Sequence, residues 1–287
     1  MTTTHRTQLR TRFSLLAALT VALAAAPAAV PAAAAPKAPA DYVALGDSYA
    51  SGFGAGTYTA CGQSLLGLPG VLDSNKKVEL TANGTCAGAA ATVVPGGAVD
   101  VPEQIAGLVA LGKLGAGTKL VTLSVGGNDA GFSTVAGACA VQPLEACARA
   151  LQLSSAAAQT TVAPKLDAAY AQLRAAAPNA VVVVTGYPHL FSPESSGPAP
   201  FPAVAQQLFN DATDTLNTVI ASRAAAAGFT YVDVVDEFAG HGVGSPDPWI
   251  TFTGFTAPDD LHPTATGYSE GYLKAVRSEV NLAQLRK

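Results

Sequence analysis

The sequence predicts an α/β fold in which a parallel sheet of about five strands lies between two layers of helices. Four short, almost continuous apolar runs are typical of strands buried on both faces: residues 41–45, 120–125, 180–185 and 229–234. Stretches with helical spacing separate these runs along the chain. Strands that alternate with helices in this way predict parallel pairing with helices on both sides of the sheet.

The helical stretches have apolar residues three or four positions apart: residues 103–114, 162–173, 204–219 and 263–280. Pro102 and Pro263 suit the first turn of a helix, and Gly228 suits the end of one. A fifth strand is expected between residues 71 and 101. Residues 52–101 and 186–202 are rich in Gly, Pro and Ser, and we interpret them as long loops of the kind that often carry function.

The N-terminus resembles a secretory signal peptide over residues 1–35. Residues 1–12 contain three arginines and no acidic residue, residues 13–25 are apolar, and Ala and Pro follow to residue 35. The alternative is an N-terminal membrane anchor, but the apolar run is short for a membrane span. We therefore expect a secreted protein without a stable membrane anchor, whose single catalytic domain covers residues 36–287.

The charge balance argues against binding to nucleic acid or to anionic membranes. Three of the 16 basic residues and none of the 20 acidic residues precede residue 36, so the remaining chain has a net charge of −7. No cluster of Lys or Arg interrupts this acidic character.

The four cysteines of an exported chain are expected to form two disulfides. Three pairings are possible, and proximity in sequence favours Cys61–Cys86 and Cys139–Cys147. No Cys-x-x-Cys motif occurs and the four histidines are scattered, so a zinc site is not expected.

Polar residues that suit acyl transfer follow three of the predicted strands. Ser48 follows the first, Asn128 follows the run at 120–125, and a loop after the fourth leads to Asp259, Asp260 and His262. In open parallel sheets the active site lies beyond the carboxyl ends of the strands, so these side chains are expected at one edge. A serine, an amide side chain and an Asp/His pair are the groups that acyl transfer uses.

The motifs at these positions resemble those of the SGNH (GDSL-type) hydrolases. Residues 42–52 (YVALGDSYASG) resemble the first conserved block, residues 86–89 (CAGA) the second, residues 126–129 (GGND) the third, and Asp259-x-x-His262 the fifth. The blocks occur in the family's order and span nearly the whole predicted mature chain, and the likeness is greatest to the exported actinobacterial lipases and esterases. The resemblance implies a three-layer, flavodoxin-like domain.

The resemblance also implies a role for each site residue. Ser48 would attack the ester carbonyl, His262 would act as general base, and Asp259 would orient His262. The main-chain N–H groups of Ser48 and Gly88 and the side-chain amide of Asn128 would form the oxyanion hole. We further expect the helix that starts at Pro263 to favour neutral His262, and this chemistry needs no cofactor.

Several alternatives remain open at the level of sequence. Asp260 is an alternative to Asp259 as the acid that orients His262, because it is one residue nearer to the histidine. Asp47 and Asp129 are expected to make structural hydrogen bonds. His189 and His241 are expected to be loop residues. Five residues line the acyl site or pack within loops: Tyr187, Leu190, Phe191, Trp249 and Phe252. The expected substrate is a lipid or another acyl ester, and the enzyme is expected to be a monomer. The alternative functions are a phospholipase, a polysaccharide deacetylase and a non-catalytic binding protein.

Overall fold

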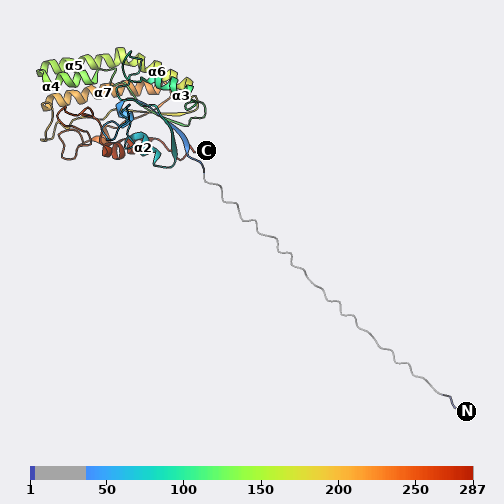
Figure 1. Cartoon of the computed structure of the whole chain (residues 1–287). Helices are drawn as coiled ribbons and strands as arrows, with labels where there is room; N and C mark the ends of the chain where they lie inside the picture. Colours follow the sequence, from blue (N-terminus) through green and yellow to red (C-terminus); the bar gives the residue numbers. More distant parts are fainter. Residues whose placement is uncertain (4–36, 287) are drawn as a thin grey trace. The chain divides into compact units, whose positions relative to one another are not determined.

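The computed structural model describes residues 1–3 and 37–286, so the predicted signal peptide lies almost wholly outside the described residues. The chain divides into two units, Met1–Pro36 and Lys37–Lys287, and the fold described below is that of the second unit (Figure 1). Within the described residues, no helix has the length and apolar character needed to cross a membrane.

The second unit is built on a five-stranded parallel sheet. In chain order the strands are β1 (Ala40–Gly46), β2 (Val78–Asn83), β3 (Leu120–Ser124), β4 (Val181–Thr185) and β5 (Thr230–Val232). They are arranged in the order β2-β1-β3-β4-β5, and every neighbouring pair is parallel. This order is that of flavodoxin-like folds. The predicted sheet is confirmed, and β2 is the strand expected between residues 71 and 101.

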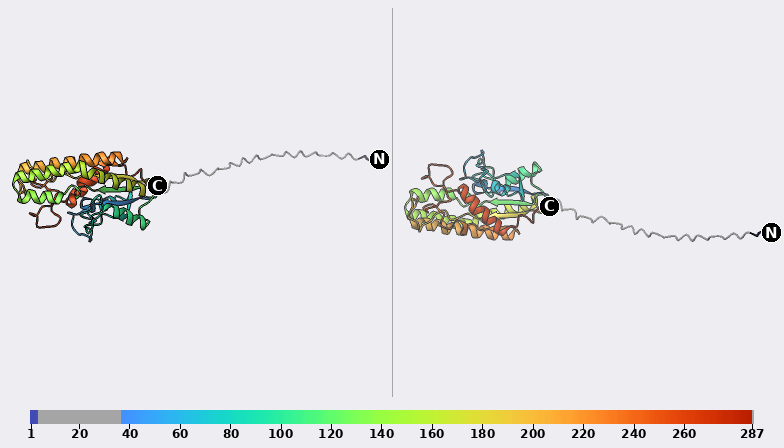
Figure 2. Two further views of the ribbon diagram at one scale, coloured as in Figure 1. Left: turned by 90° about the horizontal axis from the view of Figure 1, so that it is seen from above. Right: turned by 90° about the horizontal axis from the view of Figure 1, so that it is seen from below.

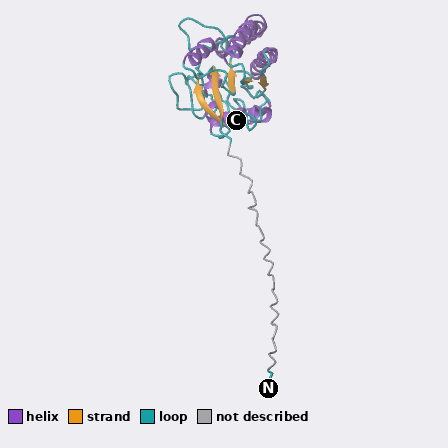
Figure 3. Cartoon of the chain, turned by 90° about the vertical axis from the view of Figure 1, so that its right-hand side faces the viewer, coloured by secondary structure: helices purple, strands orange, loops and turns teal. Residues whose placement is uncertain are grey.

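Helices cover both faces of the sheet (Figures 2 and 3). On one side, α3 (Val101–Ala110) and α7 (Ala203–Ala226) both pack against α6 (Ala163–Ala176). Helix α6 directly follows the short π-helix η1 (Ala158–Val162). On the same side α5 (Leu144–Ala157) packs on α7, and α4 (Phe132–Val141) packs on α5. The opposite side holds α1 (Ser48–Ser51), α2 (Leu68–Asp73), the π-helix η3 (Gly267–Tyr272) and α8 (Leu273–Glu279). A 3₁₀ turn, η2 (Asp236–Phe238), contacts η3.

The apolar runs form strands because both faces of the sheet are covered. All five residues of β3 and four of the five in β4 are buried. The Val-rich sequence of β4 has no polar face, since neither side of the strand meets solvent. Burial on both sides fixes the sheet as a rigid frame for the loops at its carboxyl edge.

The predicted helices at 103–114, 162–173 and 204–219 correspond to α3, α6 and α7, but three expectations were wrong. The last helix does not begin at Pro263, which forms an isolated antiparallel bridge with Ile250; the first helical residue is 265. Residues 52–101 are not only loop, since they contain the unexpected helix α2 in addition to the expected strand β2. Helices α4 and α5 were not predicted. For α4 (FSTVAGACAV) the reason is that most positions are apolar, so its sequence has no helical period to detect.

Candidate active site

Ser48 lies where β1 ends and is the first residue of α1. The preceding Asp47 caps this short helix, because its carboxylate accepts the N–H of Tyr49 at 3.0 Å. Gly46 brings β1 close to β3: its φ is +123°, and a Cβ at this position would lie 2.2 Å from the main-chain oxygen of Ser124. Only glycine permits this approach, which places Ser48 at the carboxyl edge of the sheet.

The imidazole of His262 connects Ser48 to the main chain of Asp260. Its Nε2 lies 2.8 Å from Oγ of Ser48, and its Nδ1 lies 3.0 Å from the carbonyl oxygen of Asp260. A carbonyl only accepts hydrogen bonds, so Nδ1 carries the proton and Nε2 is free to accept the proton of Ser48. Leu261 adopts a left-handed conformation (φ +64°) between the two residues, which turns the Asp260 carbonyl back toward the ring.

The structure does not bring the carboxylate of Asp259 into a hydrogen bond with His262. Asp259 accepts instead from the hydroxyl of Tyr58 at 2.5 Å, and that hydroxyl also accepts the N–H groups of Gly54 and Gly56 at 3.0 Å each. Thr251 further fixes this segment by donating to the main-chain oxygen of Asp259. The expected direct contact between Asp259 and the ring is therefore replaced by a main-chain carbonyl.

The carboxylate of the rival residue Asp260 is also turned away from His262. It accepts both the N–H of Thr253 at 2.6 Å and the Thr253 hydroxyl at 2.9 Å. Asp260 thus contributes its backbone to the site, while its side chain holds the loop in place. Sequence spacing identified the correct segment but could not distinguish a side-chain acceptor from a main-chain one.

Burial lowers the pKa of His262 below its ordinary value of 6.5. Hydrogen bonds to the main-chain carbonyls of Asp260 and Asp259, and the charges of both carboxylates, oppose this shift but do not cancel it. The helix dipole is not its cause, because the helix begins three residues after His262. The ring is consequently neutral near neutral pH, as a general base must be.

The three predicted oxyanion donors border one cavity with His262. Its lining is Asp47, Ser48, Tyr49, Phe53, Ala87, Gly88, Gly127, Asn128, Phe132, Ser133, Tyr187, Pro258 and His262. The side-chain Nδ2 of Asn128 donates to the carbonyl of Ala89 at 2.9 Å, which ties it to the loop carrying Gly88 and leaves a second N–H for a ligand. Because Ser48 occupies the first helical position, its N–H has no acceptor within α1.

Asp129 holds the loops that carry Gly88 and Asn128 together, in the structural role predicted for it. One carboxylate oxygen accepts the N–H of Ala91 at 2.8 Å, and the other lies 3.1 Å from Nζ of Lys165 on α6. Its side chain is fully buried whereas that of Lys165 is one-third exposed. The ion pair therefore anchors the Asn128 loop to both the Gly88 loop and the helix layer.

A second buried link joins Asp47, which precedes Ser48, to the Asn128 loop through Tyr187. The Tyr187 hydroxyl donates to Asp47 at 2.6 Å and accepts the N–H of Gly127 at 3.0 Å. Burial raises the pKa of Asp47 to about 7, although the Tyr187 hydroxyl and the main-chain N–H groups oppose the rise. Sequence analysis placed Tyr187 only as a lining or loop-packing residue, since no motif signals a contact over 140 positions.

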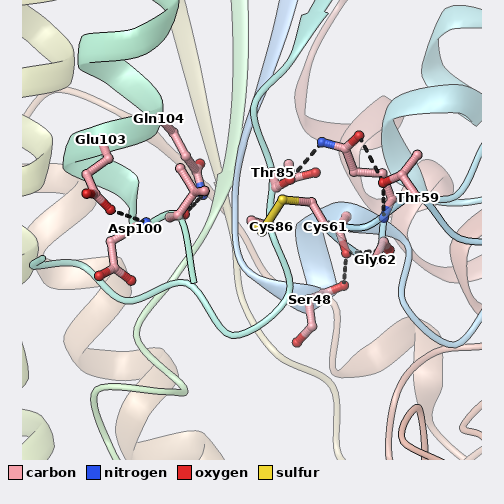
Figure 4. The surroundings of a disulfide bond; sticks show 12 residues. Ser48, Thr59, Cys61, Gly62, Thr85, Cys86, Asp100, Glu103 and Gln104 are labelled. Carbon is pink, nitrogen blue, oxygen red and sulfur yellow. Dashed lines mark hydrogen bonds between the residues drawn. A yellow bond between two sulfur atoms is a disulfide. The ribbon is translucent and has the colours of Figure 1, made fainter. Parts of the chain in front are cut away.

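Both disulfides have the pairing that sequence proximity favoured. Cys61–Cys86 lies beside the site (Figure 4), where the N–H of Cys86 donates to the carbonyl of Gly46 at 3.0 Å. The N–H of Ala87 in turn donates to the carbonyl of Cys61 at 2.8 Å. This bridge therefore fixes the loop that leads to Gly88 against the end of β1.

The other four residues predicted to line the acyl site or to pack within loops lie elsewhere. Leu190 and Phe191 are buried in the core, Phe252 contacts Phe255, and Trp249 stacks on His241 with ring centroids 3.6 Å apart. His189 lies 2.7 Å from Asp214, so both histidines are loop residues, as predicted. Among the described residues, no three or more His, Cys, Asp or Glu side chains are grouped so as to hold a metal ion.

Comparison with known proteins agrees with this geometry. The family model described as GDSL-like Lipase/Acylhydrolase matches residues 44–269. "Lipase 1" of Streptomyces coelicolor is 38% identical over 248 residues, which cover 84% of this chain and 87% of that protein. The lipase of Streptomyces rimosus is 35% identical over 249 residues, or 85% of this chain and 88% of that protein.

Two solved structures share the fold at comparable identity. The extracellular lipase from Streptomyces rimosus superposes with a TM-score of 0.74 and 34% identity, over 84% of this chain and all of that chain. Phospholipase A1 from Streptomyces albidoflavus NA297 gives the same TM-score and identity, over 85% of this chain and all of that chain. The chain therefore belongs to the GDSL-like lipase/acylhydrolase family and is a carboxylic ester hydrolase.

Proposed function

We propose that the enzyme hydrolyses acyl esters through an acyl-enzyme intermediate on Ser48, with His262 as general base. The observation that carries this proposal is the 2.8 Å contact between His262 Nε2 and Ser48 Oγ in a cavity that Gly88 and Asn128 also line. A nucleophile within hydrogen-bonding distance of a base whose other nitrogen is fixed is the arrangement that acyl transfer needs.

The reaction proceeds in two halves. Oγ of Ser48 attacks the ester carbonyl carbon while Nε2 of His262 takes the hydroxyl proton. The N–H groups of Ser48 and Gly88 and the Asn128 amide hold the negative oxygen of the tetrahedral intermediate. His262 then protonates the leaving alcohol and next deprotonates a water that attacks the acyl group. Collapse of the second intermediate releases the acid and returns the proton to Ser48.

In this proposal the main-chain oxygen of Asp260 orients His262, and Asp259 is a positioning residue. The carboxylate of Asp259 supports the ring by its charge and by fixing Tyr58, which binds the Gly54–Gly56 loop beside His262. Gly54 packs closely there, since a Cβ would lie 2.9 Å from Cβ of His262. The segment from residue 54 to 58 is therefore one wall of the base's surroundings.

The substrate class we favour is the esters of fatty acids, as acted on by the lipases of Streptomyces coelicolor and Streptomyces rimosus. Phospholipid is a second candidate, because phospholipase A1 of Streptomyces albidoflavus NA297 matches equally well. Ser48 and His262 would act in the same way on either substrate. The two activities would differ in the protein groups that contact the alcohol portion of the substrate.

The test is hydrolysis of p-nitrophenyl esters from acetate to palmitate, followed by emulsified triacylglycerol and phosphatidylcholine. Ser48→Ala should lower kcat by at least about 10⁴-fold on every ester, because removing the nucleophile leaves only binding and the oxyanion hole. Ser222→Ala, an exposed serine on α7, is the matched control and should keep the wild-type rate. Retention of turnover by Ser48→Ala would refute the assignment.

We also propose that residues 1–35 are a signal peptide and that residues 36–287 form one secreted catalytic domain that acts as a monomer. All the proposed catalytic groups come from one chain, so the site needs no second copy. Expression of the full chain in a secreting bacterial host should release into the medium a protein whose N-terminus lies near residue 36. Light scattering should give the mass of one chain.

A further inference from the structure

A second, apolar cavity lies next to the catalytic cavity. It is bounded by α4, α5 and α7, and it shares two lining residues, Gly127 and Phe132, with the cavity that contains Ser48. Gly127 directly precedes the proposed oxyanion residue Asn128. A chain that leaves the reacting carbonyl along Gly127 and Phe132 therefore leads from one cavity into the other.

The lining of the second cavity suits hydrocarbon. Its other members are Ala130, Val135, Leu151, Ser154, Phe209, Ala212, Thr213 and Leu216. Both hydroxyl groups are already used: Ser154 donates to the carbonyl of Ala130 at 2.7 Å, and Thr213 donates to that of Phe209 at 3.1 Å. None of the described residues that line it is charged. Water requires two to four polar partners in such a space, so an apolar ligand is favoured.

Phe132 is the side chain that separates the two cavities. It is half-buried at the start of α4, and its ring makes edge-to-face contacts with Tyr49 on the catalytic side and with Phe209 on the apolar side. The centroid distances are 6.5 and 5.5 Å. The Cys139–Cys147 bridge joins α4 to α5, which restricts how far this wall moves.

We propose that this apolar cavity binds the methyl-terminal part of the substrate's acyl chain and that Phe132 limits the chain length it accepts. The proposal rests on the function proposed above and adds a specificity-determining residue to it. The ester carbonyl sits at Ser48 and Asn128, and the chain passes Gly127 to reach the space between α4, α5 and α7. Acyl groups too short to pass Phe132 do not use this space.

The first test narrows the cavity. Ala212→Leu adds three carbon atoms on its α7 wall and should lower kcat/KM on p-nitrophenyl octanoate by about tenfold, with acetate nearly unchanged, because each excluded methylene is worth about fourfold. Ala225→Leu makes the same change on an exposed position of α7 and should leave the octanoate-to-acetate ratio as in the wild type. Equal ratios in the two variants would overturn the proposal.

The second test opens the cavity and does not depend on the first variant folding. Phe132→Ala should raise the decanoate-to-acetate ratio of kcat/KM by about fivefold, in line with one to two additional buried methylenes. An unchanged or lower ratio would overturn the role of Phe132. Circular dichroism melting of each variant identifies one that fails to fold, in which case the other variant decides.

These outcomes are separate from failure of the proposed function. If the wild-type enzyme hydrolyses no ester at all, the serine mechanism fails. If it hydrolyses esters and Ser48→Ala does not, but both cavity variants, Ala212→Leu and Phe132→Ala, keep the wild-type chain-length profile, only the acyl-cavity proposal fails.

Discussion

At the scale of single residues, the proposed mechanism depends on the protonation state of His262, because only the neutral ring can accept the proton of Ser48. The ring is buried beside Ser48, and its pKa is lowered below 6.5 mainly by loss of hydration. Because burial disfavours the charged imidazolium, the ring remains neutral to a lower pH than a free histidine would. The main-chain carbonyl of Asp260 keeps the proton on Nδ1, so a single tautomer faces the nucleophile.

This state predicts the pH dependence of the reaction. Because the pKa of His262 is lowered, the ring becomes protonated and inactive as a base only when the pH falls through a value below 6.5. The value of kcat/KM on p-nitrophenyl acetate should therefore decrease on the acid side with a midpoint below pH 6.5. A titration of initial rates between about pH 4.5 and pH 8 checks this expectation. An acid limb centred at or above 6.5 would show that the charged ring is favoured by a carboxylate rather than disfavoured by burial.

The carboxylate of Asp259 should matter less than that of a conventional triad, because this carboxylate acts on His262 only through Tyr58 and through its charge. Asp259→Asn should lower kcat by no more than about 10²-fold, compared with about 10⁴-fold where a carboxylate contacts the histidine directly. Tyr58→Phe should produce a similar loss. The kcat of the double variant should be no lower than that of the less active single variant, since both substitutions disrupt the same Tyr58–Asp259 contact. A 10⁴-fold loss in Asp259→Asn alone would restore the direct triad.

At the scale of elements, buried polar links connect loops that belong to different strands. Tyr187 follows β4 and joins Asp47 at the end of β1 to Gly127 at the end of β3. Asp129 joins the loop after β3 to the loop after β2. The segments that carry Ser48, Gly88 and Asn128 are thus held by hydrogen bonds between strand ends, and the sheet sets the spacing of those ends.

Tyr187→Phe should lower kcat by about tenfold with little change in KM, because the loops lose their alignment while the cavity keeps its shape. It should also reduce the free energy of unfolding by about 1–3 kcal/mol, since buried Asp47 loses a donor. Tyr170→Phe is the matched control, because its buried hydroxyl has no hydrogen-bond partner and its removal should cost little. Steady-state kinetics and urea denaturation measure both effects, and equal behaviour of the two variants would contradict the link.

At the scale of the whole molecule, the two disulfides restrain loops of different length. Cys61–Cys86 closes 25 residues and Cys139–Cys147 closes 8. The chain-entropy relation gives about 3.5 kcal/mol for the longer loop and about 2.5 kcal/mol for the shorter one. The longer loop contains β2 and leads to Gly88, so it affects both stability and the oxyanion hole.

Replacement of Cys61 and Cys86 by Ala should therefore destabilise the enzyme more than replacement of Cys139 and Cys147, and it alone should lower kcat on p-nitrophenyl acetate. Urea denaturation of the two double variants gives the order of stability, and initial rates give the effect on turnover. The reverse order of stability, or equal kcat values, would show that native-state packing outweighs the restraint on the unfolded chain.

The sheet and the positions of Ser48 and His262 at its edge could be predicted from the sequence, because each has a local signature. Continuous apolar runs identify strands covered on both faces, and the residues that follow them identify the active edge. Nearness of the cysteines along the chain was also enough to favour the correct pairing. By contrast, α4 escaped detection, since its apolar side chains lie on several faces and leave no helical period in the sequence.

The surroundings of these groups follow from contacts between distant segments of the chain. The acceptor for His262 is a main-chain carbonyl, and a backbone atom has no sequence signature. The contacts of Tyr58 with Asp259 and of Tyr187 with Asp47 join residues 201 and 140 positions apart. The cavity beside Phe132 arises from three helices that the sheet brings together. Hydrogen bonds and cavities depend on distances between distant segments, and packing of the whole chain sets those distances.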